Sequence, residues 1–367
     1  MSTILNIILF VLILGLLVFV HELGHFLTAK KSGVFIHEFS IGMGPLIKTI
    51  KGKDGINYSI RALPLGGFVQ MAGEIYEDDD TDKIPKDKFM CNKKWYQRFL
   101  ILFAGVFNNF LLALVLLFVI AFFWGAPSLD PIVNGVTEGK PAEAAGMRAG
   151  DTILEVNGKK VSTWDKAQLL LIVKDKDNTY EIKVKHTDGK TELVKVKPEE
   201  VEDEEGNKSR VFGIEIKQKV SGKYKIGASL KYAWKKFWAT VDQMGATIGN
   251  LFTGGISINN LSGPVGIYTV VGESRKAGFE NIIFLTAYLS INLGIMNILP
   301  IPALDGGHIM FLIVELITRK KANAKVESIL TAVFFFLLIL LMIYIKHFLL
   351  SFVYLSFLFC IKIIHMK

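Results

Sequence analysis

The sequence has little cysteine and little charge. Two cysteines among 367 residues are too few for a disulfide framework or a thiolate metal site. Hydrophobic residues make up 51% of the chain and charged residues only 21%, and the mean hydropathy is +0.40. This composition excludes a disordered chain and argues against an ordinary soluble domain.

The hydrophobic residues are pooled in runs that contain no charged residue. These runs cover residues 1–20, 99–124, 281–304 and 328–345, and a shorter apolar stretch at residues 347–361 lies in the tail of residues 346–367. A helix of about 18 or more apolar residues can cross the hydrocarbon core of a bilayer. The first run lacks the basic start and the cleavage site of a signal peptide, so we expect a retained helix over residues 1–27. The sequence predicts a polytopic α-helical membrane protein with four transmembrane helices.

The basic residues behind the formal net charge of +8 gather in two loops. Residues 30–98 carry 12 basic and 9 acidic side chains and residues 319–325 add four cations, whereas residues 130–200 hold 12 basic and 13 acidic groups. Cationic loops face the cytoplasm under the positive-inside rule, so the N-terminus and residues 125–280 are expected outside. Membrane orientation explains the basicity better than nucleic-acid binding does, and we expect no nucleic-acid partner.

A motif with catalytic chemistry lies at the end of the first run, where the sequence reads His21-Glu22-Leu-Gly-His25. Residues four apart share one face of a helix, so His21 and His25 can bind one zinc ion while Glu22 acts as a base on water. An ionisable Glu22 in an apolar segment is costly unless it has a partner or a wet cavity. The alternative, polar residues that only mark the membrane boundary, is the weaker interpretation.

A site with two histidines needs a third ligand. His37 and Glu38 are the nearby candidates, but a second motif at residues 297–308 reads Asn-Ile-Leu-Pro-Ile-Pro-Ala-Leu-Asp-Gly-Gly-His. Its prolines cannot continue a regular helix, and broken backbone at membrane depth is tolerated where it is buried or lines a cavity. Asp305 could therefore turn its carboxylate toward an ion held by another helix. The alternative is a helix that ends with a solvated aspartate, and His308 is a rival ligand.

Together, residues 21–25 and 297–306 resemble the catalytic motifs of the site-2 protease family of intramembrane zinc metalloproteases, in particular its bacterial members of the RseP/RasP type. The resemblance covers most of the chain. Supporting segments are residues 40–45, 58–71, 95–109 and 261–266. Val106 departs from the family pattern, which often has proline at that place, and the tail beyond residue 346 has no match.

The resemblance implies a zinc site and a catalytic base. His21, His25 and Asp305 would be the metal ligands, with a fourth position left for water, and Glu22 would be the catalytic residue. The implied activity is that of a zinc metalloendopeptidase, which hydrolyses peptide bonds within transmembrane segments of other proteins. Regulated intramembrane proteolysis of anti-sigma factors or removal of remnant signal peptides are examples.

The resemblance also implies substrate contacts, partners and location. The amides of Asn297 and Asn292 would bind substrate; the alternative is that they hold helices together. The substrates would be single-pass membrane proteins, some of them trimmed first by another protease. The expected location is the bacterial cytoplasmic (inner) membrane, with the active site toward the cytoplasmic side.

Residues 28–98 are expected to form a cytoplasmic loop with a membrane-associated β-hairpin. Strand-like stretches at 35–41 and 58–62 flank a turn at 51–55. A transmembrane helix hides its amides in hydrogen bonds, so an edge strand could hold a substrate once it has unwound. The alternative is a structural loop packed on the helices. The acidic stretch at residues 74–87 is expected to be a solvated loop.

Residues 130–200 resemble a PDZ domain outside the membrane. The motif at residues 146–158 combines a glycine-rich turn, an apolar strand and an Asn-Gly hairpin turn, and strand-like runs follow at 180–184 and 192–196. PDZ modules bind peptides at an open sheet edge, so we expect control of substrate access; a passive spacer is the alternative. Residues 201–209 are expected to be a charged linker.

Residues 201–280 connect this domain to the third membrane helix and contain a predicted amphipathic helix at 229–244. Its apolar face comprises Leu230, Ala233, Trp234, Phe237, Trp238, Val241 and Met244, and its polar face Lys231, Lys235, Lys236 and Asp242. Spacings of three and four are typical of one helical face. Tryptophan opposite lysine suits a helix in the lipid interface; the alternative is packing on the soluble domain.

Two other functions fit parts of the pattern. Broken helices with polar groups also build ion-coupled transporters, but the two halves of this chain show no internal similarity. A PDZ-bearing membrane scaffold without catalysis would not need the intact set of His21, Glu22, His25 and Asp305. The sequence therefore predicts an intramembrane zinc metalloprotease.

Overall fold

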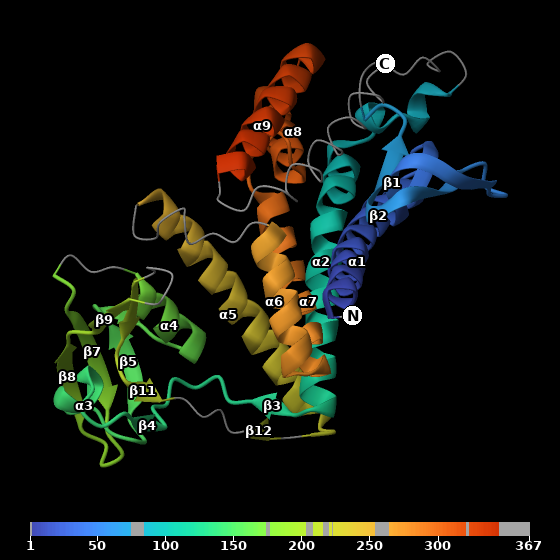
Figure 1. Cartoon of the computed structure of the whole chain (residues 1–367). Coiled ribbons are helices and arrows are strands. Elements are labelled where there is room, and N and C mark those ends of the chain that lie inside the picture. The colour runs from blue at the N-terminus through green and yellow to red at the C-terminus, as the bar shows by residue number, and fades with distance from the viewer. Residues whose placement is uncertain are drawn as a thin grey trace. The chain divides into compact units, whose positions relative to one another are not determined.

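The computed structural model describes residues 2–74, 84–173, 177–202, 208–215, 220–221, 223–253, 264–320 and 323–344 (Figure 1). Several predicted features lie wholly or partly outside these residues, among them the acidic loop at 74–87, the linker at 201–209, the start of the 261–266 motif and the apolar tail at 346–367. The chain divides into two compact units, residues 1–116 with 261–367 and residues 117–260.

Helices dominate the first unit. They are α1 (Ser2–Lys31), α2 (Trp95–Phe123), which continues into the second unit, α6 (Pro264–Ala277), α7 (Phe279–Ile298), α8 (Asp305–Thr318) and α9 (Ala324–Tyr344). Among the described residues, α1, α2 and α7 are long and apolar enough to cross a membrane. The chain is therefore a membrane protein, and the fourth predicted span, which falls mostly within α9, stays a prediction.

Helices α1, α6 and α7 lie alongside one another (Figure 1). Phe10, Ile13 and Leu17 of α1 pack with Val271 of α6 and Leu285 of α7. Lipid tails are as apolar as these side chains, so close van der Waals contact rather than the hydrophobic effect holds such helices together. This packing fixes α7, and with it the second sequence motif, beside α1.

The backbone breaks between α7 and α8. Helix α7 ends at Ile298, before the predicted residue 304, because Pro300 and Pro302 have no N–H with which to continue it. Helix α8, which the sequence analysis did not predict, begins at Asp305. The break therefore places Asp305 in the first turn of a new helix.

A β-hairpin forms where the sequence predicts one, with longer strands. β1 (Ile36–Lys51) pairs antiparallel with β2 (Asn57–Met71). Both strands bend back, because residues 38–41 pair with 67–70 on one side and with 57–60 on the other. Segment 67–71 is thus an edge of this small sheet. Two short 3-10 helices, η1 (Lys86–Lys88) and η2 (Met90–Asn92), precede α2.

The hairpin is fastened to the end of α1. The ring of Phe26 lies 4.7 Å from that of Phe39 and 6.0 Å from that of Tyr58, measured between centroids. At the turn, Lys30 Nζ lies 2.6 Å from Asp54 Oδ2. Hydrogen bonds from Lys30 and Tyr58 lower the pKa of Asp54 to about 2. These contacts fix the position of the hairpin relative to residues 21–25 of α1.

Short strands make up most of the second unit. They are β3 (Ala126–Pro127), β4 (Gly135–Val136), β5 (Thr152–Val156), β6 (Lys159–Lys160), β7 (Tyr180–Lys185), β8 (Thr191–Val196), β9 (Glu199–Glu202), β10 (Lys208–Val211), β11 (Ile214–Glu215) and β12 (Val220–Ser221), with helices α3 (Pro141–Ala144), α4 (Trp164–Ile172) and α5 (Ile226–Phe252). One sheet has the order β6-β5-β7-β8. Asn157 and Gly158 join β5 to β6 with φ of 49° and 73°, as an Asn-Gly hairpin turn requires.

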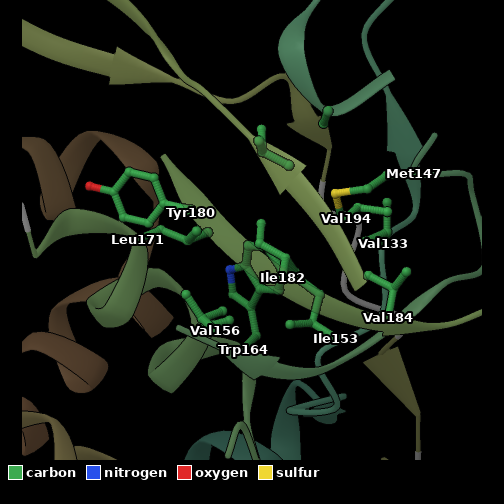
Figure 2. Close-up of a cluster of buried hydrophobic side chains, with 13 residues drawn as sticks. Val133, Met147, Ile153, Val156, Trp164, Leu171, Tyr180, Ile182, Val184 and Val194 are labelled. Atoms are coloured by element: carbon green, nitrogen blue, oxygen red, sulfur yellow. The ribbon is translucent and has the colours of Figure 1, made fainter. Parts of the chain in front are cut away.

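The core of this unit gathers side chains from β5, β7, β8 and α4 (Figure 2). Tyr180, Ile182 and Val184 alternate with exposed or partly exposed residues along β7, which is the pattern of a strand with one face buried. All three belong to the buried cluster that also contains Trp164 of α4 and Val156 of β5. The domain therefore has a hydrophobic core of its own.

The folded domain extends beyond the predicted end at residue 200. The predicted linker at 201–209 is wrong in its described part, because β9 pairs with β10 and β11 then pairs with β4. Phe212 and Ile214 pack against the core. The charged composition of β9 and β10 is typical of a linker, so these strands could not be predicted from composition alone.

The predicted amphipathic helix forms as α5 and presents two faces with apolar residues instead of one. The buried face comprises Ser229, Tyr232, Ala233, Lys236, Phe237 and Thr240, each at most 8% exposed. The exposed face comprises Ile226, Leu230, Trp234 and Trp238, between 49% and 62% exposed. The placement of Lys236 on the polar face was wrong, because its Nζ lies 2.8 Å from both carboxylate oxygens of Asp165 in α4.

Lys236→Ala should destabilise the second unit by about 3 kcal/mol, because it leaves the largely buried carboxylate of Asp165 without its cation. Lys235→Ala removes a neighbouring, exposed lysine and should change the free energy of unfolding by less than about 0.5 kcal/mol. Urea unfolding followed by tryptophan fluorescence compares the two variants. Equal stabilities would contradict the packing of α5 on α4.

Candidate metal centre

Three side chains from distant parts of the sequence meet in the first unit. His21 Nε2 and His25 Nε2 of α1 lie 3.1 Å apart, and Asp305 Oδ2 of α8 lies 3.0 and 3.4 Å from them. Both histidines are 7% exposed. Within the described residues, this is the group of His, Cys, Asp and Glu side chains whose ligand atoms are close enough to share one metal ion.

Helix α1 is continuous through residues 21–25, so the two histidines stand one turn apart on the same face. Asp305 reaches them from the first turn of α8. Gly306 and Gly307 allow this approach, because a Cβ at either position would clash with the backbone of residues 298–302. The glycines therefore let α8 start directly against the broken segment.

Helix α2 passes close to both histidines because two glycines leave room for it. A Cβ at Gly24 would clash with the carbonyl of Ala104, and one at Gly105 would clash with both imidazoles. The close approach brings the carbonyl oxygen of Ile101 to 2.8 Å from His25 Nδ1. Nδ1–H of His25 therefore donates to Ile101, and in the neutral imidazole this leaves Nε2 without a proton and able to bind a metal ion.

The oxygen of Asp305 that faces the histidines has no hydrogen bond. Its Oδ2 is buried, and a buried carboxylate oxygen is costly unless a hydrogen bond or a cation compensates it. Zinc binds His nitrogen at about 2.0–2.1 Å in tetrahedral sites, so ligand atoms around one ion lie about 3.3 Å apart. The separations of 3.0–3.4 Å observed here fit that geometry. The residues present therefore suit zinc.

Glu22 lies beside the edge of the hairpin. An added Cβ at Gly67 would stand 3.7 Å from Glu22 Cγ, and Gly67 is the first residue of the edge segment 67–71. A strand edge and a carboxylate therefore meet next to the two histidines.

The two predicted substrate-binding asparagines differ in their positions. Asn297 Nδ2 lies 3.4 Å from His21 Nε2, so the end of α7 brings this amide to the candidate metal centre. Asn292 Oδ1 is buried and has no hydrogen-bond partner, and no hydrogen bond joins it to the histidines. The structure thus brings together His21, His25, Asp305 and Asn297, but not Asn292.

The rival ligands stay apart from this group. His308 Nδ1 lies 2.9 Å from Glu327 Oε1 of α9, and Glu38 forms an ion pair with Arg61 at 2.9 Å. His37 Nε2 is buried without a hydrogen bond and is not part of the candidate metal centre.

Sequence reasoning gave no role to two polar residues of α2, one of which contacts the first motif and the other the residue before it. Asn108 Nδ2 donates to the carbonyl oxygen of Val20 at 3.2 Å, and Asn109 Nδ2 lies 3.2 Å from His21 Nδ1. The available signal was a pair of adjacent amides inside an apolar run, because such residues in a membrane helix seek a partner.

Gly105→Ala should weaken zinc binding by about 10- to 100-fold, because the methyl group would displace the two imidazoles from the positions that zinc ligation requires. Gly249→Ala in α5 makes the same change where an added Cβ meets nothing within 4 Å, so it should leave zinc binding unchanged. Competition with a chelator measures both affinities. Wild-type affinity in Gly105→Ala would contradict the close approach of α2.

Comparison with known proteins agrees with these features. The model of peptidase family M50 matches residues 9–341. A putative zinc metalloprotease of Fusobacterium nucleatum is 40% identical over 322 residues, covering 87% of this chain and 90% of that protein. One of Clostridium acetobutylicum is 34% identical, covering 92% and 95%. The regulator of sigma-W protease RasP of Bacillus subtilis is 32% identical, covering 92% and 96%.

The family match includes both motifs, residues 21–25 and 297–306. It lends no support to a transporter or to a scaffold without catalysis. The resemblance seen in the sequence is confirmed, and Zn²⁺ is the cofactor. The chain belongs to peptidase family M50 and is an intramembrane zinc metalloprotease of the site-2 type.

Proposed function

We propose that His21, His25 and Asp305 hold the catalytic zinc ion and that Glu22 is the general base for cleavage of membrane-spanning segments. The observation that carries this proposal is the convergence of the three ligand atoms, from residues 280 positions apart in sequence (305 − 25), to within 3.4 Å of one another. Membrane proteins are the substrate class that the family match supports. Single-pass substrates, some already trimmed by another protease, are the narrower proposal.

Zinc, when bound, supplies a Lewis acid that polarises the scissile carbonyl and lowers the pKa of water to about 7. Glu22 then takes a proton from the attacking water and passes it to the leaving amide nitrogen. Its place next to His21 in the sequence, on a helix that continues beyond both histidines, keeps the carboxylate near the scissile bond. Burial of the histidines excludes bulk water, which strengthens these electrostatic effects.

Asn297 is positioned to assist at the same point. Its amide nitrogen, near His21, can donate a hydrogen bond to the oxygen that becomes negative in the transition state. Asn292 lies more than one turn earlier in α7, and we propose that it contacts substrate further from the scissile bond. Its buried, unpaired oxygen supports this role.

The hairpin edge offers a way to hold an unwound substrate. A helical substrate must lose hydrogen bonds before an amide becomes accessible, and the lipid cannot replace them. Segment 67–71 forms an edge of the sheet, and we propose that this edge binds an unwound substrate by β-augmentation. Ile41, Leu46, Ile47, Ile50 and Ile60 of the same hairpin are 46–66% exposed, which supports its association with the membrane.

The orientation we propose follows the charges. The last turn of α1 carries Lys30 and Lys31, and Arg98 lies in the first turn of α2. Positive residues favour the cytoplasm, so these ends, and the metal centre near them, would face it. Four spans, with α9 as the fourth, would place the second unit outside the bacterial inner membrane.

We propose that the second unit is a PDZ-like domain that controls which substrates enter. Its glycine-rich turn, the Asn157-Gly158 hairpin and its independent core support this assignment. Helix α5 would couple the domain to the membrane: its buried face packs on α4 through Lys236 and Asp165, and its exposed face carries Trp234 and Trp238.

Glu22→Gln should lower cleavage of a transmembrane substrate by about 10²- to 10⁴-fold, because the amide cannot accept the proton. Zinc content should stay at the wild-type level, since the three ligands are intact. Glu273→Gln makes the same chemical change at an exposed site in α6 and should cleave normally. Wild-type cleavage by Glu22→Gln protein would refute the proposed mechanism.

Lipid-borne quenchers should reach Trp234 and Trp238 at the depth of the headgroups if α5 lies in the interface. The part of the fluorescence quenching that comes from these two residues is the difference between the wild type and the double variant Trp234→Phe/Trp238→Phe. Trp164, which is 5% exposed within the domain core, serves as the internal unquenched reference. Equal quenching of the wild type and the double variant would contradict the proposal that α5 lies at the membrane surface.

A further inference from the structure

Asn109 is a fully buried polar residue in the apolar helix α2. Its backbone carbonyl accepts a hydrogen bond from Ser290 Oγ of α7 at 2.7 Å, and its side-chain amide faces His21 Nδ1 at 3.2 Å. The residue therefore sits between the helix that carries the histidines and the helix that leads to Asp305. Its position is fixed from two sides.

The two nitrogens of His21 have different tasks. Nε2 faces His25 Nε2 and Asp305 Oδ2, so this nitrogen must carry no proton when it binds a metal ion. A neutral imidazole then carries its proton on Nδ1. In a buried site this Nδ1–H needs an acceptor, because metal-bound histidines donate their other N–H to a carbonyl, a carboxylate or water.

His25 meets this requirement through the carbonyl oxygen of Ile101. The corresponding neighbour of His21 Nδ1 is the amide of Asn109, which offers both a donor and an acceptor. Asn109 Oδ1 is buried and has no hydrogen-bond partner. Rotation of the amide by half a turn brings Oδ1 to Nδ1–H, so that these two groups pair, and turns Nδ2 to the position that Oδ1 occupies now.

We propose that Asn109 Oδ1 accepts a hydrogen bond from His21 Nδ1–H and so holds His21 in the tautomer and orientation that bind zinc. Asn109 is then a positioning residue for the metal centre. The inference rests on the proposed role of His21 as a ligand. It assigns to α2 the same function toward both histidines: the carbonyl of Ile101 orients His25, and the amide of Asn109 orients His21.

Asn108 provides a matched control. It is the adjacent residue with the same side chain, but its amide donates to the carbonyl of Val20 rather than to an imidazole. Asn108→Leu therefore removes a helix–helix hydrogen bond without removing a contact to His21. A purely structural role of Asn109 would make the two leucine variants behave alike.

The test measures zinc affinity of the full-length protein by chelator competition in Asn109→Asp, Asn109→Leu and Asn108→Leu. Asn109→Asp keeps an acceptor and should bind zinc within about threefold of the wild type or more tightly, because carboxylate–histidine–zinc arrangements are common. Asn109→Leu has no acceptor and should bind about 10- to 100-fold more weakly. Asn108→Leu should bind as the wild type does.

Two results would overturn the inference: wild-type affinity in Asn109→Leu, or a loss of tenfold or more in Asn109→Asp. The aspartate variant decides the matter by itself if Asn109→Leu does not fold. A wild-type protein that binds no zinc would instead refute the proposed metal centre. If the wild type binds zinc, a change in affinity among the Asn109 variants tests the positioning role alone and not the metal centre as a whole.

Discussion

The close contact between α1 and α2 is the constraint on which the metal centre depends. Gly24 and Gly105 carry no side chain at the point where the helices meet, and any Cβ there would push α2 away from the imidazoles. At this distance the carbonyl of Ile101 can accept the proton of His25 Nδ1. A motif of two histidines on one helix therefore becomes an oriented pair of ligands only because a second helix lies against it.

The third donor depends on a different device, the break between α7 and α8. Pro300 and Pro302 end one helix, and Gly306 and Gly307 allow the next to begin at once against the broken backbone. Asp305 is placed in the first turn of the new helix and reaches α1. A break in a helix costs free energy within a membrane unless protein surrounds it. Because this break lies at the candidate metal centre, we infer that it serves to place Asp305.

The sequence was sufficient to predict a zinc metalloprotease and to single out His21, His25 and Asp305, which the fold brings together. His21, Glu22 and His25 are visible in a spacing rule, and Asp305 stands out as a carboxylate after two prolines in an apolar run. These residues are recognisable because ionisable groups and helix breakers are rare in membrane segments. The long apolar helices and the Asn-Gly turn follow from equally local rules.

Other features could not be predicted because they depend on tertiary contact. Lys236 looked like a solvent-facing lysine, and only the position of Asp165 on another helix makes its burial tolerable. The strands β9, β10 and β11 are short and carry charged residues, and they are defined by the pairing of β9 with β10 and of β11 with β4, and by Phe212 packing against the core. Asn109 resembles any amide in a membrane helix until His21 is seen beside it.

The central claim is that His21, His25 and Asp305 hold one zinc ion. Zinc content and affinity of the purified full-length protein, compared among the wild type, Asp305→Ala and His308→Ala, test it most directly. The account predicts one zinc ion per chain in the wild type and in His308→Ala, and binding weaker by more than about 100-fold in Asp305→Ala, a larger loss than removal of a supporting residue causes. Unchanged affinity in Asp305→Ala, or loss of zinc in His308→Ala alone, would contradict it.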